Sequence, residues 1–202
     1  MDYGILASDG ATVDVKFVAP LQMTSNAPVF VSDSVSLKRH AVSQKAQRWE
    51  LLAGLMPESR SRKFFLHNVT HGHTTPFFIR APQPNGIEKE ISKTAMMTAS
   101  GSAGSSNIYI SVGSEVAGKI PAGTFVNFVG HNKLYLLMDD VTGSAFYDIY
   151  PALTQAITSV AMVYKPQDVK MYAMYDPDVA VGIRYTDGVL SDPGQLKFIE
   201  RL

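Results

Sequence analysis

Apolar and polar residues alternate with a period of two along much of the chain, which is the pattern of β-strands with one buried face. Residues 13–17 alternate Val or Phe with Asp or Lys, and residues 35–38 alternate Val or Leu with Ser or Lys. Turn residues separate such segments at short intervals, which is typical of a mainly β, mostly antiparallel fold. The other predicted strands cover residues 46–52, 107–112, 125–129, 134–138, 145–150, 169–175, 179–185 and 196–202, and one more ends at Arg80.

One helix interrupts this pattern. Pro57 and Glu58 suit its first turn, and Gly72 suits its end. Between them the apolar residues fall partly at helical spacing. Two other segments are expected to be irregular. Residues 98–106 are small and polar and predict a loop or linker, and residues 139–144 are rich in Asp and Gly and predict the turn of a hairpin.

The large apolar residues predict two cores. Trp49 lies in a strand of mixed polarity and is expected to be a packing anchor rather than a ligand platform. It should pack with Leu51, Phe64 and Phe65 between the helix and a sheet. The second core is expected to contain Phe125, Phe128, Leu134 and Leu136.

The amino-acid composition excludes several classes of function. The chain has 202 residues, of which 46% are hydrophobic and 18% charged, as expected for one large or two small folded domains. Its 18 basic residues balance its 18 acidic residues, which argues against a protein that grips a nucleic-acid backbone. The lack of cysteine excludes disulfides and thiolate chemistry. Without a long apolar segment or the basic start of a secretory signal, we expect a soluble protein with no membrane partner.

The candidate chemical sites do not predict an enzyme. His71 and His73 could bind a metal only with a third ligand from far away in the sequence, and their charge suits a helix end without a metal. Neither a GxxxxGK[ST] phosphate loop nor a GxSxG nucleophile turn occurs. The acidic residues near positions 139 and 176 lie among turn residues and favour turns over acid–base catalysis. The sequence therefore predicts no catalytic residue, no cofactor and no metal ligand.

Two segments resemble proteins of bacteriophage tails. The first is VSLKRHAVSQKAQRWEL (residues 35–51). It resembles the strand, short basic turn and Gln-Arg-Trp strand near the N-terminus of tail proteins of tailed bacteriophages. The second is IPAGTFVNFVGHNKLY (residues 120–135), followed by IYPAL (residues 149–153). It is similar to a pattern in the second domain of distal tail, or baseplate hub, proteins, and the two segments occur in the order of that family.

The resemblance implies a fold. Distal tail proteins have a tail-tube-like β-sandwich with one helix, interrupted by an inserted small β-barrel-like domain. Turn-rich residues near Ala81 and a return to long strands near Lys165 mark where such an insertion would begin and end in this chain. We therefore expect residues 1–80 plus 165–202 to form the tail-tube-like, ring-forming domain, and residues 81–164 to form the inserted domain.

The resemblance also implies a function. The chain is expected to be a structural virion protein and not an enzyme. It would be a subunit of a ring, usually hexameric, that joins the tail tube to the distal adsorption apparatus at the tail tip or baseplate hub. Its expected partners are further copies of itself and other tail or baseplate proteins, with DNA only as cargo passing through the lumen. It would be made in the host cytoplasm and reside in the virion.

Ring formation draws attention to one expected hairpin. The strands over residues 35–40 and 47–52, joined by a turn over residues 41–45, would present an edge to which a neighbouring subunit could pair. Long hairpins of this kind line the bore in the resembled family. The candidate inter-subunit contacts are therefore Leu37, Lys38, Arg39, Lys45 and Arg48.

An alternative from another functional class stays open. A β-barrel could recognise a glycan of the host surface through aromatic residues such as Tyr109, Tyr135 and Tyr147. A ring subunit should form a large or concentration-dependent species in solution, whereas a glycan-binding module should stay monomeric until glycan is added. A histidine–metal enzyme ranks below both possibilities.

Overall fold

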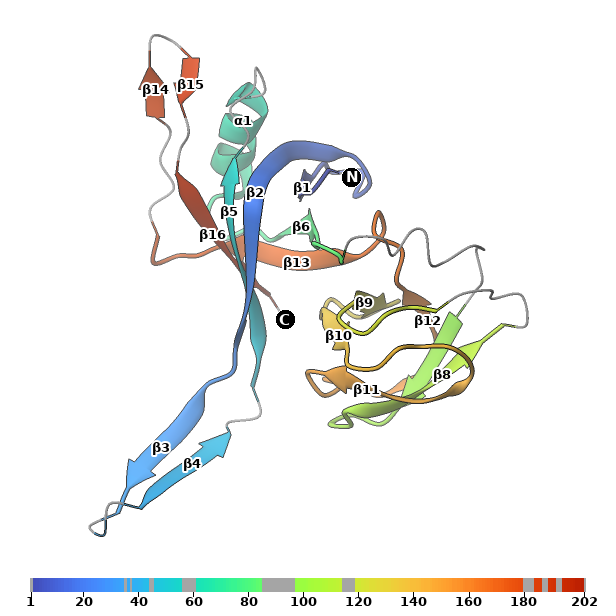
Figure 1. The fold of residues 1–202 in the computed structure, drawn as a ribbon. Coiled ribbons are helices and arrows are strands. Elements are labelled where there is room, and N and C mark those ends of the chain that lie inside the picture. Colours follow the sequence, from blue (N-terminus) through green and yellow to red (C-terminus); the bar gives the residue numbers. More distant parts are fainter. Residues whose placement is uncertain are drawn as a thin grey trace.

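Two closed β-barrels organise the chain (Figure 1). The structure, a computed structural model, describes residues 2–34, 36, 38–43, 46–55, 61–84, 97–113, 119–179, 184–186, 189–191 and 194–201. The first barrel has the strand order β1-β2-β5-β16-β13-β6. Its strands are β1 (Gly4–Leu6), β2 (Val13–Asn26), β5 (Arg48–Leu55), β6 (Phe77–Arg80), β13 (Lys170–Tyr175) and β16 (Gln195–Glu200).

The second barrel is built from strands that follow one another between β6 and β13. Its order is β10-β11-β8-β7-β12-β9. These strands are β7 (Met97–Gly101), β8 (Asn107–Val112), β9 (Phe125–Phe128), β10 (Tyr135–Leu137), β11 (Ala145–Tyr150) and β12 (Ile157–Val163). The remaining elements are helix α1 (Ser61–His71) and two hairpins, β3 (Val29–Asp33) with β4 (Arg39–Ser43), and β14 (Arg184–Thr186) with β15 (Val189–Ser191). The described chain is thus mainly β, as the alternation predicts.

Strand β5 shows how the alternation builds the first barrel. Trp49, Leu51, Ala53 and Leu55 are all buried, whereas the residues between them are partly exposed. Because successive side chains of a strand point to opposite faces, one face of β5 enters the core and the other faces outward. The strand pairs with β2 on one side and with β16 on the other, so that it has no free edge within the barrel.

Strand β2 extends beyond the barrel. Its pairing with β5 shifts register between Val18 and Gln22. Pro20 lies within this interval and has no N–H to donate to a neighbouring strand, which accounts for an irregularity at this place. After the shift, β2 and β5 run together away from the barrel core, and they lead into the β3–β4 hairpin (Figure 1).

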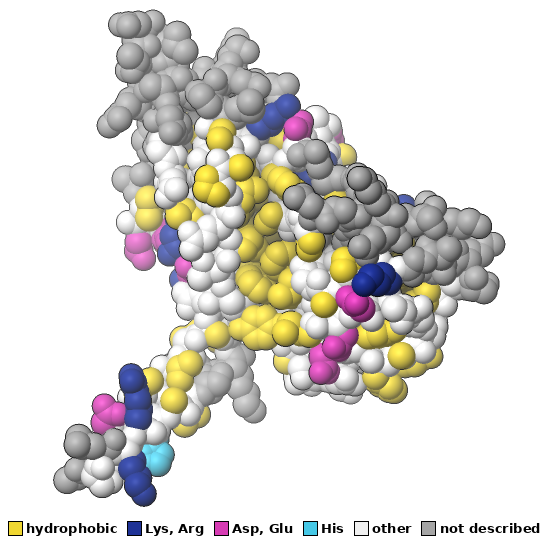
Figure 2. Space-filling view, in the orientation of Figure 1, with side chains coloured by type: hydrophobic (Ala, Val, Ile, Leu, Met, Phe, Trp, Pro, Cys, Tyr) yellow, Lys and Arg dark blue, Asp and Glu magenta, His cyan; other side chains and the backbone are white. Residues whose placement is uncertain are grey.

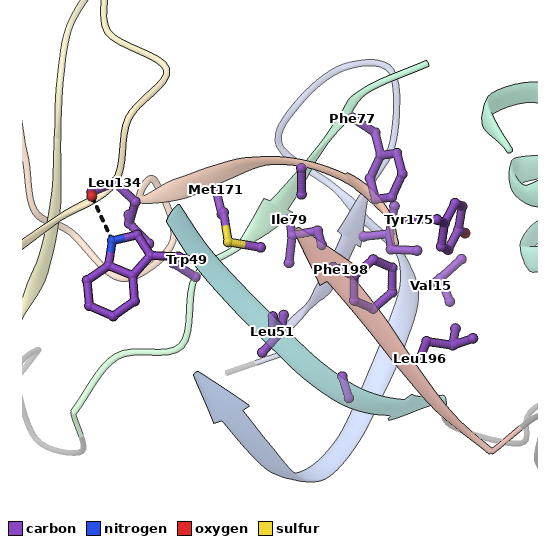
Figure 3. Packing of buried hydrophobic residues seen from close by; sticks show 14 of the residues in the cluster. Val15, Trp49, Leu51, Phe77, Ile79, Leu134, Met171, Tyr175, Leu196 and Phe198 are labelled. Atoms are coloured by element: carbon purple, nitrogen blue, oxygen red, sulfur yellow. Dashed lines mark hydrogen bonds between the residues drawn. The ribbon is translucent and has the colours of Figure 1, made fainter. Parts of the chain in front are cut away.

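Each barrel has its own buried core. Figure 3 shows the first core, where side chains from β5, β6, β13 and β16 meet. Phe17 and Phe198, from opposite ends of the sequence, pack there with ring centroids 5.3 Å apart. Trp49 is 5% exposed, and its indole N–H donates a 2.9 Å hydrogen bond to the carbonyl oxygen of Leu134. Trp49 is confirmed as a packing anchor and Leu51 as buried. However, Trp49 packs where the two barrels meet, against Phe125 and Tyr150, and not between the helix and a sheet as expected.

The expected core of the second barrel is partly wrong. Phe128 is buried there, but Leu134 belongs to the first core, and Phe125 and Leu136 pack against that core as well. The neighbouring residues Val126 and Tyr135 point into the second barrel instead. Strands β9 and β10 therefore have two apolar faces, one for each core, and hydrophobicity alone does not tell which face serves which barrel. The side chains of Phe64 and Phe65 lie outside the described residues.

Two local expectations are confirmed. The predicted hairpin around residues 139–144 is confirmed, because β10 pairs with β11 across it. Helix α1 ends where Gly72 was expected to end it, with φ of +51° and an N–H bonded to the carbonyl of Asn68. Its expected start near Pro57 lies outside the described residues. No helix among the described residues is long and apolar enough to cross a membrane.

One expected loop is partly wrong, and one expected strand is described only in part. Residues 98–101 belong to strand β7 rather than to a loop, because Met97 and Ala99 point into the core while Thr98 and Ser100 point outward. Small side chains conceal this alternation in the sequence. Of the expected strand over residues 179–185, Val179 lies in a bend and residues 184–185 belong to β14, whereas residues 180–183 lie outside the described residues.

Candidate assembly surface

The β3–β4 hairpin forms an arm that projects from the first barrel (Figure 1). Its strands pair antiparallel at five positions, from Val29 opposite Ser43 to Asp33 opposite Arg39. The hairpin closes through Ser34, whose N–H bonds the carbonyl of Lys38 over 2.9 Å and whose hydroxyl accepts the N–H of Lys38 over 3.1 Å. Short polar side chains at this position favour a turn.

The arm exposes apolar side chains on both faces. Phe30 and Val42 lie opposite each other and are 62% and 63% exposed. Val29 and Val31 belong to the other face and are also exposed. A two-stranded hairpin is marginally stable in water, and a contiguous exposed apolar surface marks an interaction site. Both faces of the arm therefore favour contact with another molecule.

The hairpin expected from the sequence is wrong, because it joins strands that do not pair with each other. Residues 41–43 belong to strand β4 and do not form a turn, and β5 pairs with β2 and β16 rather than with residues 35–40. The strand that does pair with β4 is the apolar run at residues 29–31, which does not alternate with polar residues. A period-two search therefore passes over it. The signal that could have identified it is an apolar run between Pro28 and the turn-forming pair Asp33-Ser34.

The five predicted contact residues are not brought together. Lys38 and Arg39 are exposed at the tip of the arm. Arg48 lies at its root, at the start of β5, and forms a 3.2 Å ion pair with Glu50. Leu37 and Lys45 lie outside the described residues. Of the predicted set, only Lys38 and Arg39 are placed together on a projecting surface among the described residues.

The root of the arm contains a shallow hollow of about 370 Å³, lined by Asn26, Pro28, Ala46, Gln47 and Arg48. Glu50 stabilises its wall, since it accepts hydrogen bonds from the side chains of Asn26 and Arg48. Burial raises the pKa of Glu50, but the hydrogen bonds from Asn26 and from Lys197 outweigh burial and hold the pKa below its usual range. The root is therefore a fixed, charged end of the arm.

A buried ion pair fixes this root against the second barrel. Lys133 of the second barrel donates to the carbonyl of Gln47 over 2.8 Å and pairs with Glu200 of β16. Glu200 also accepts the backbone N–H of Trp49 at 3.0 Å and that of Leu134 at 2.7 Å. Burial lowers the pKa of Lys133, and the charge of Glu200 opposes this shift. We call these residues, Gln47, Trp49, Lys133, Leu134 and Glu200, the barrel clamp.

A buried amide adds a second connection between the barrels. Gln83 donates from Nε2 to the carbonyl of Phe125 over 2.8 Å and accepts the N–H of Phe125 over 2.9 Å. Its side chain thus pairs with β9 as the backbone of another strand would. The Tyr150 hydroxyl of the second barrel lies 2.8 Å from the hydroxyl of Ser25 in β2. These contacts position the arm relative to both barrels.

The aromatic residues suggested for glycan binding are mostly buried. Tyr135 is fully buried and Tyr147 is buried, and both belong to the second core. Their positions in β10 and β11 alternate inward, because their neighbours point outward. Only Tyr109 of the three is exposed, and it packs against Phe146, which was not expected to form part of a site. A platform of three aromatic residues is therefore wrong.

The histidines near the end of α1 pack as a cluster of rings. His67 and His71 have ring centroids 4.4 Å apart, and Nδ1 of His67 lies 2.9 Å from the hydroxyl oxygen of Tyr175. The ring of His73 contacts the same tyrosine. Across the part of the chain that the structure describes, no three His, Cys, Asp or Glu side chains are grouped to hold a metal ion. The cluster joins the helix to the first core.

This cluster predicts acid sensitivity. Burial, and then the charge of His71, lower the pKa of His67 from 6.5 to about 4. The unfolded chain therefore binds more protons than the folded chain between these values. The free energy of unfolding should be at its full value above pH 6.5 and fall as the pH decreases toward 4. Urea unfolding at several pH values, compared with His67→Gln, measures this slope. A His67 ring that titrates above pH 6 by NMR would contradict the prediction.

Comparison with known proteins does not place the chain in a family. No protein-family model and no curated protein matches it. The resemblance to tail proteins consequently depends on the two sequence segments alone. The features of this chain that bear on its function are the projecting arm, the barrel clamp at its root and the exposed residues around them.

Proposed function

We propose that this chain is a structural virion protein, a ring-forming subunit of a bacteriophage tail tip or baseplate hub. The observation that carries the proposal is the projecting β3–β4 arm, which exposes apolar side chains on both faces. In a single copy the apolar side chains of the arm stay in water and contribute no burial energy. In a ring, neighbouring subunits would cover each arm and bury these side chains. The two sequence segments that resemble tail proteins support the same assignment.

The proposal assigns a part to each region. The first barrel, with α1, would correspond to the tail-tube-like β-sandwich of residues 1–80 plus 165–202, and the second barrel to the inserted domain of residues 81–164. The ring would be hexameric and would join the tail tube to the distal adsorption apparatus. Its partners would be copies of itself and other tail or baseplate proteins, with DNA passing through the lumen.

A matched pair of variants tests this function. Val42 lies on the arm and Val69 lies on α1, and they are 63% and 68% exposed. Val42→Ser removes apolar surface that the ring would bury, at a cost of about 1–2 kcal/mol per contact, so the association constant should fall roughly tenfold or more. Val69→Ser changes the same residue type at similar exposure and should leave association unchanged. Sedimentation velocity over a concentration series, with electron microscopy of the rings, measures both.

Two results would contradict the proposal. One is a wild-type protein that stays monomeric at its highest soluble concentration and forms no ring when neighbouring tail proteins are added. The other is equal association of the Val42→Ser and Val69→Ser variants with the wild type. Either result would favour a monomeric binding module.

A further inference from the structure

We propose that the β3–β4 arm of one copy docks onto the outer face of β8 and β11 in the second barrel of another copy. This inference rests on the proposed function and names the surface that receives the arm. It commits to a second copy of this chain because the two surfaces, described below, are complementary in both apolar character and charge.

The receiving face carries an exposed aromatic pair. Tyr109 of β8 and Phe146 of β11 lie directly opposite in the strand register, and their ring centroids are 5.2 Å apart. They are 39% and 67% exposed, which is unusual for adjacent large rings on a sheet. Met138 is also exposed, and its N–H bonds the carbonyl of Asp148, two residues from Phe146. We call these residues, Tyr109, Met138 and Phe146, the aromatic face.

Carboxylates border the aromatic face. Asp139 accepts the N–H of Asp148 over 2.9 Å, and Asp148 accepts the side-chain amide of Asn107 over 2.7 Å. Both partners are neutral groups, and within the described chain neither carboxylate forms an ion pair. Asp140 accepts the backbone N–H of Ala122 and pairs with Lys119. The hydrogen bond from Ala122, and then the contact with Lys119, lower the pKa of Asp140. The border is therefore negatively charged, and no cation of the described residues neutralises Asp139 or Asp148.

The arm presents the complementary pattern. Phe30 and Val42 form an exposed apolar stem, and Lys38, Arg39 and His40 follow at the exposed tip. The tip also carries the exposed Asp33, opposite Arg39 in the strand register, but Lys38 and Arg39 keep its net charge positive. Figure 2 shows these basic side chains together with an acidic one at the end of the arm, and acidic side chains beside hydrophobic ones on the second barrel. An apolar stem with a basic tip matches an aromatic face with an acidic border. Such complementarity increases the association rate and fixes the register of a contact.

The contact has to be between copies. In the same chain the arm extends away from the second barrel (Figure 1). A surface that binds a different surface of the next copy is heterologous, so that every copy gives one arm and receives another. Repeated contacts of this kind close into a ring when the rotation per copy is right. The arm has a second apolar face, with Val29 and Val31, which stays available for a neighbouring arm.

Charge reversal on each side provides the test. The arm variant is Lys38→Glu with Arg39→Glu, and the border variant is Asp139→Lys with Asp148→Lys. Each should associate with itself at least tenfold more weakly than the wild type. In an equimolar mixture the acidic arm of the arm variant can bind the basic border of the border variant. The native arm of the border variant can bind the native border of the arm variant. Both contacts are then complementary in charge, and rings should form again. Lys63→Glu, on α1 at the other end of the first barrel, is the control for a change of charge and should assemble like the wild type.

The aromatic face is tested separately, because a border variant could disturb the local turn. Phe146→Ser removes an exposed ring and should weaken assembly at least tenfold, with unchanged circular dichroism. If the wild type forms rings and these variants assemble equally well, the docking proposal is overturned but the proposed ring function is not. A strictly monomeric wild type would overturn both. Binding of purified lipopolysaccharide that requires Phe146, with assembly unaffected by Phe146→Ser, would assign the face to a saccharide and overturn the docking.

Discussion

Replacement of Trp49 by alanine is expected to lower the free energy of unfolding by about 3–5 kcal/mol. The ring is buried where the two barrels meet, and it packs edge-on against Phe125 and Tyr150 with centroid distances of 5.1 and 5.9 Å. Alanine would leave a cavity between the cores. It would also deprive the carbonyl of Leu134 of its hydrogen-bond donor.

The measurement needs a probe other than tryptophan fluorescence, since Trp49 is the single tryptophan of the chain. Urea unfolding followed by far-ultraviolet circular dichroism serves both proteins. Trp49→Phe, which keeps a ring but lacks the indole N–H, should be intermediate. A loss of less than about 1 kcal/mol for Trp49→Ala would show that the ring is not an anchor between the barrels.

Replacement of Glu200 by leucine is expected to cost about 3–5 kcal/mol, because it leaves the buried ammonium of Lys133 without its counter-charge. It also removes the acceptor of two backbone N–H groups, those of Trp49 and Leu134. Lys133→Met should cost less, since the carboxylate of Glu200 keeps both of these hydrogen bonds. The two single variants are therefore expected to differ, with the glutamate the more damaging change.

An exposed ion pair is the control for this experiment. Lys63 pairs with Asp14 at the surface, and Lys63→Met should cost less than about 1 kcal/mol. All three variants are compared by urea unfolding. Equal losses for Glu200→Leu and Lys63→Met would mean that the barrel clamp does not stabilise the fold.

Local patterns predicted what is encoded locally. The alternation in β5, the hairpin between β10 and β11 and the burial of Trp49 all follow from short segments of sequence. The arm was misplaced because Val29, Phe30 and Val31 are consecutive apolar residues with no buried face in one chain. A pattern search expects one apolar face and one polar face, and a strand with exposed apolar residues on both faces does not have this pattern.

Local sequence patterns do not predict which strands pair across long sequence separations. Strand β16 lies between β5 and β13 in the first barrel, and nothing in residues 195–200 specifies these partners. The barrel clamp was missed for another reason. Lysine and glutamate are seldom buried, so that Lys133 and Glu200 are assigned to the surface unless their partners are known. Two of the tyrosines named for glycan binding, Tyr135 and Tyr147, were placed at the surface for the same reason, because the sequence does not tell which faces they occupy.

The place of β16 between β5 and β13 has a consequence for synthesis on the ribosome. The second barrel uses residues 97–163 and can fold while later residues are still being added. The first barrel cannot close until residues 195–200 have emerged, because they bridge two of its strands. The arm thus acquires its fixed root only after residues 195–200 have emerged. A chain that stops before residue 195 would lack the pairing of β16 with β5 and β13, and with it the closed barrel from which the arm projects.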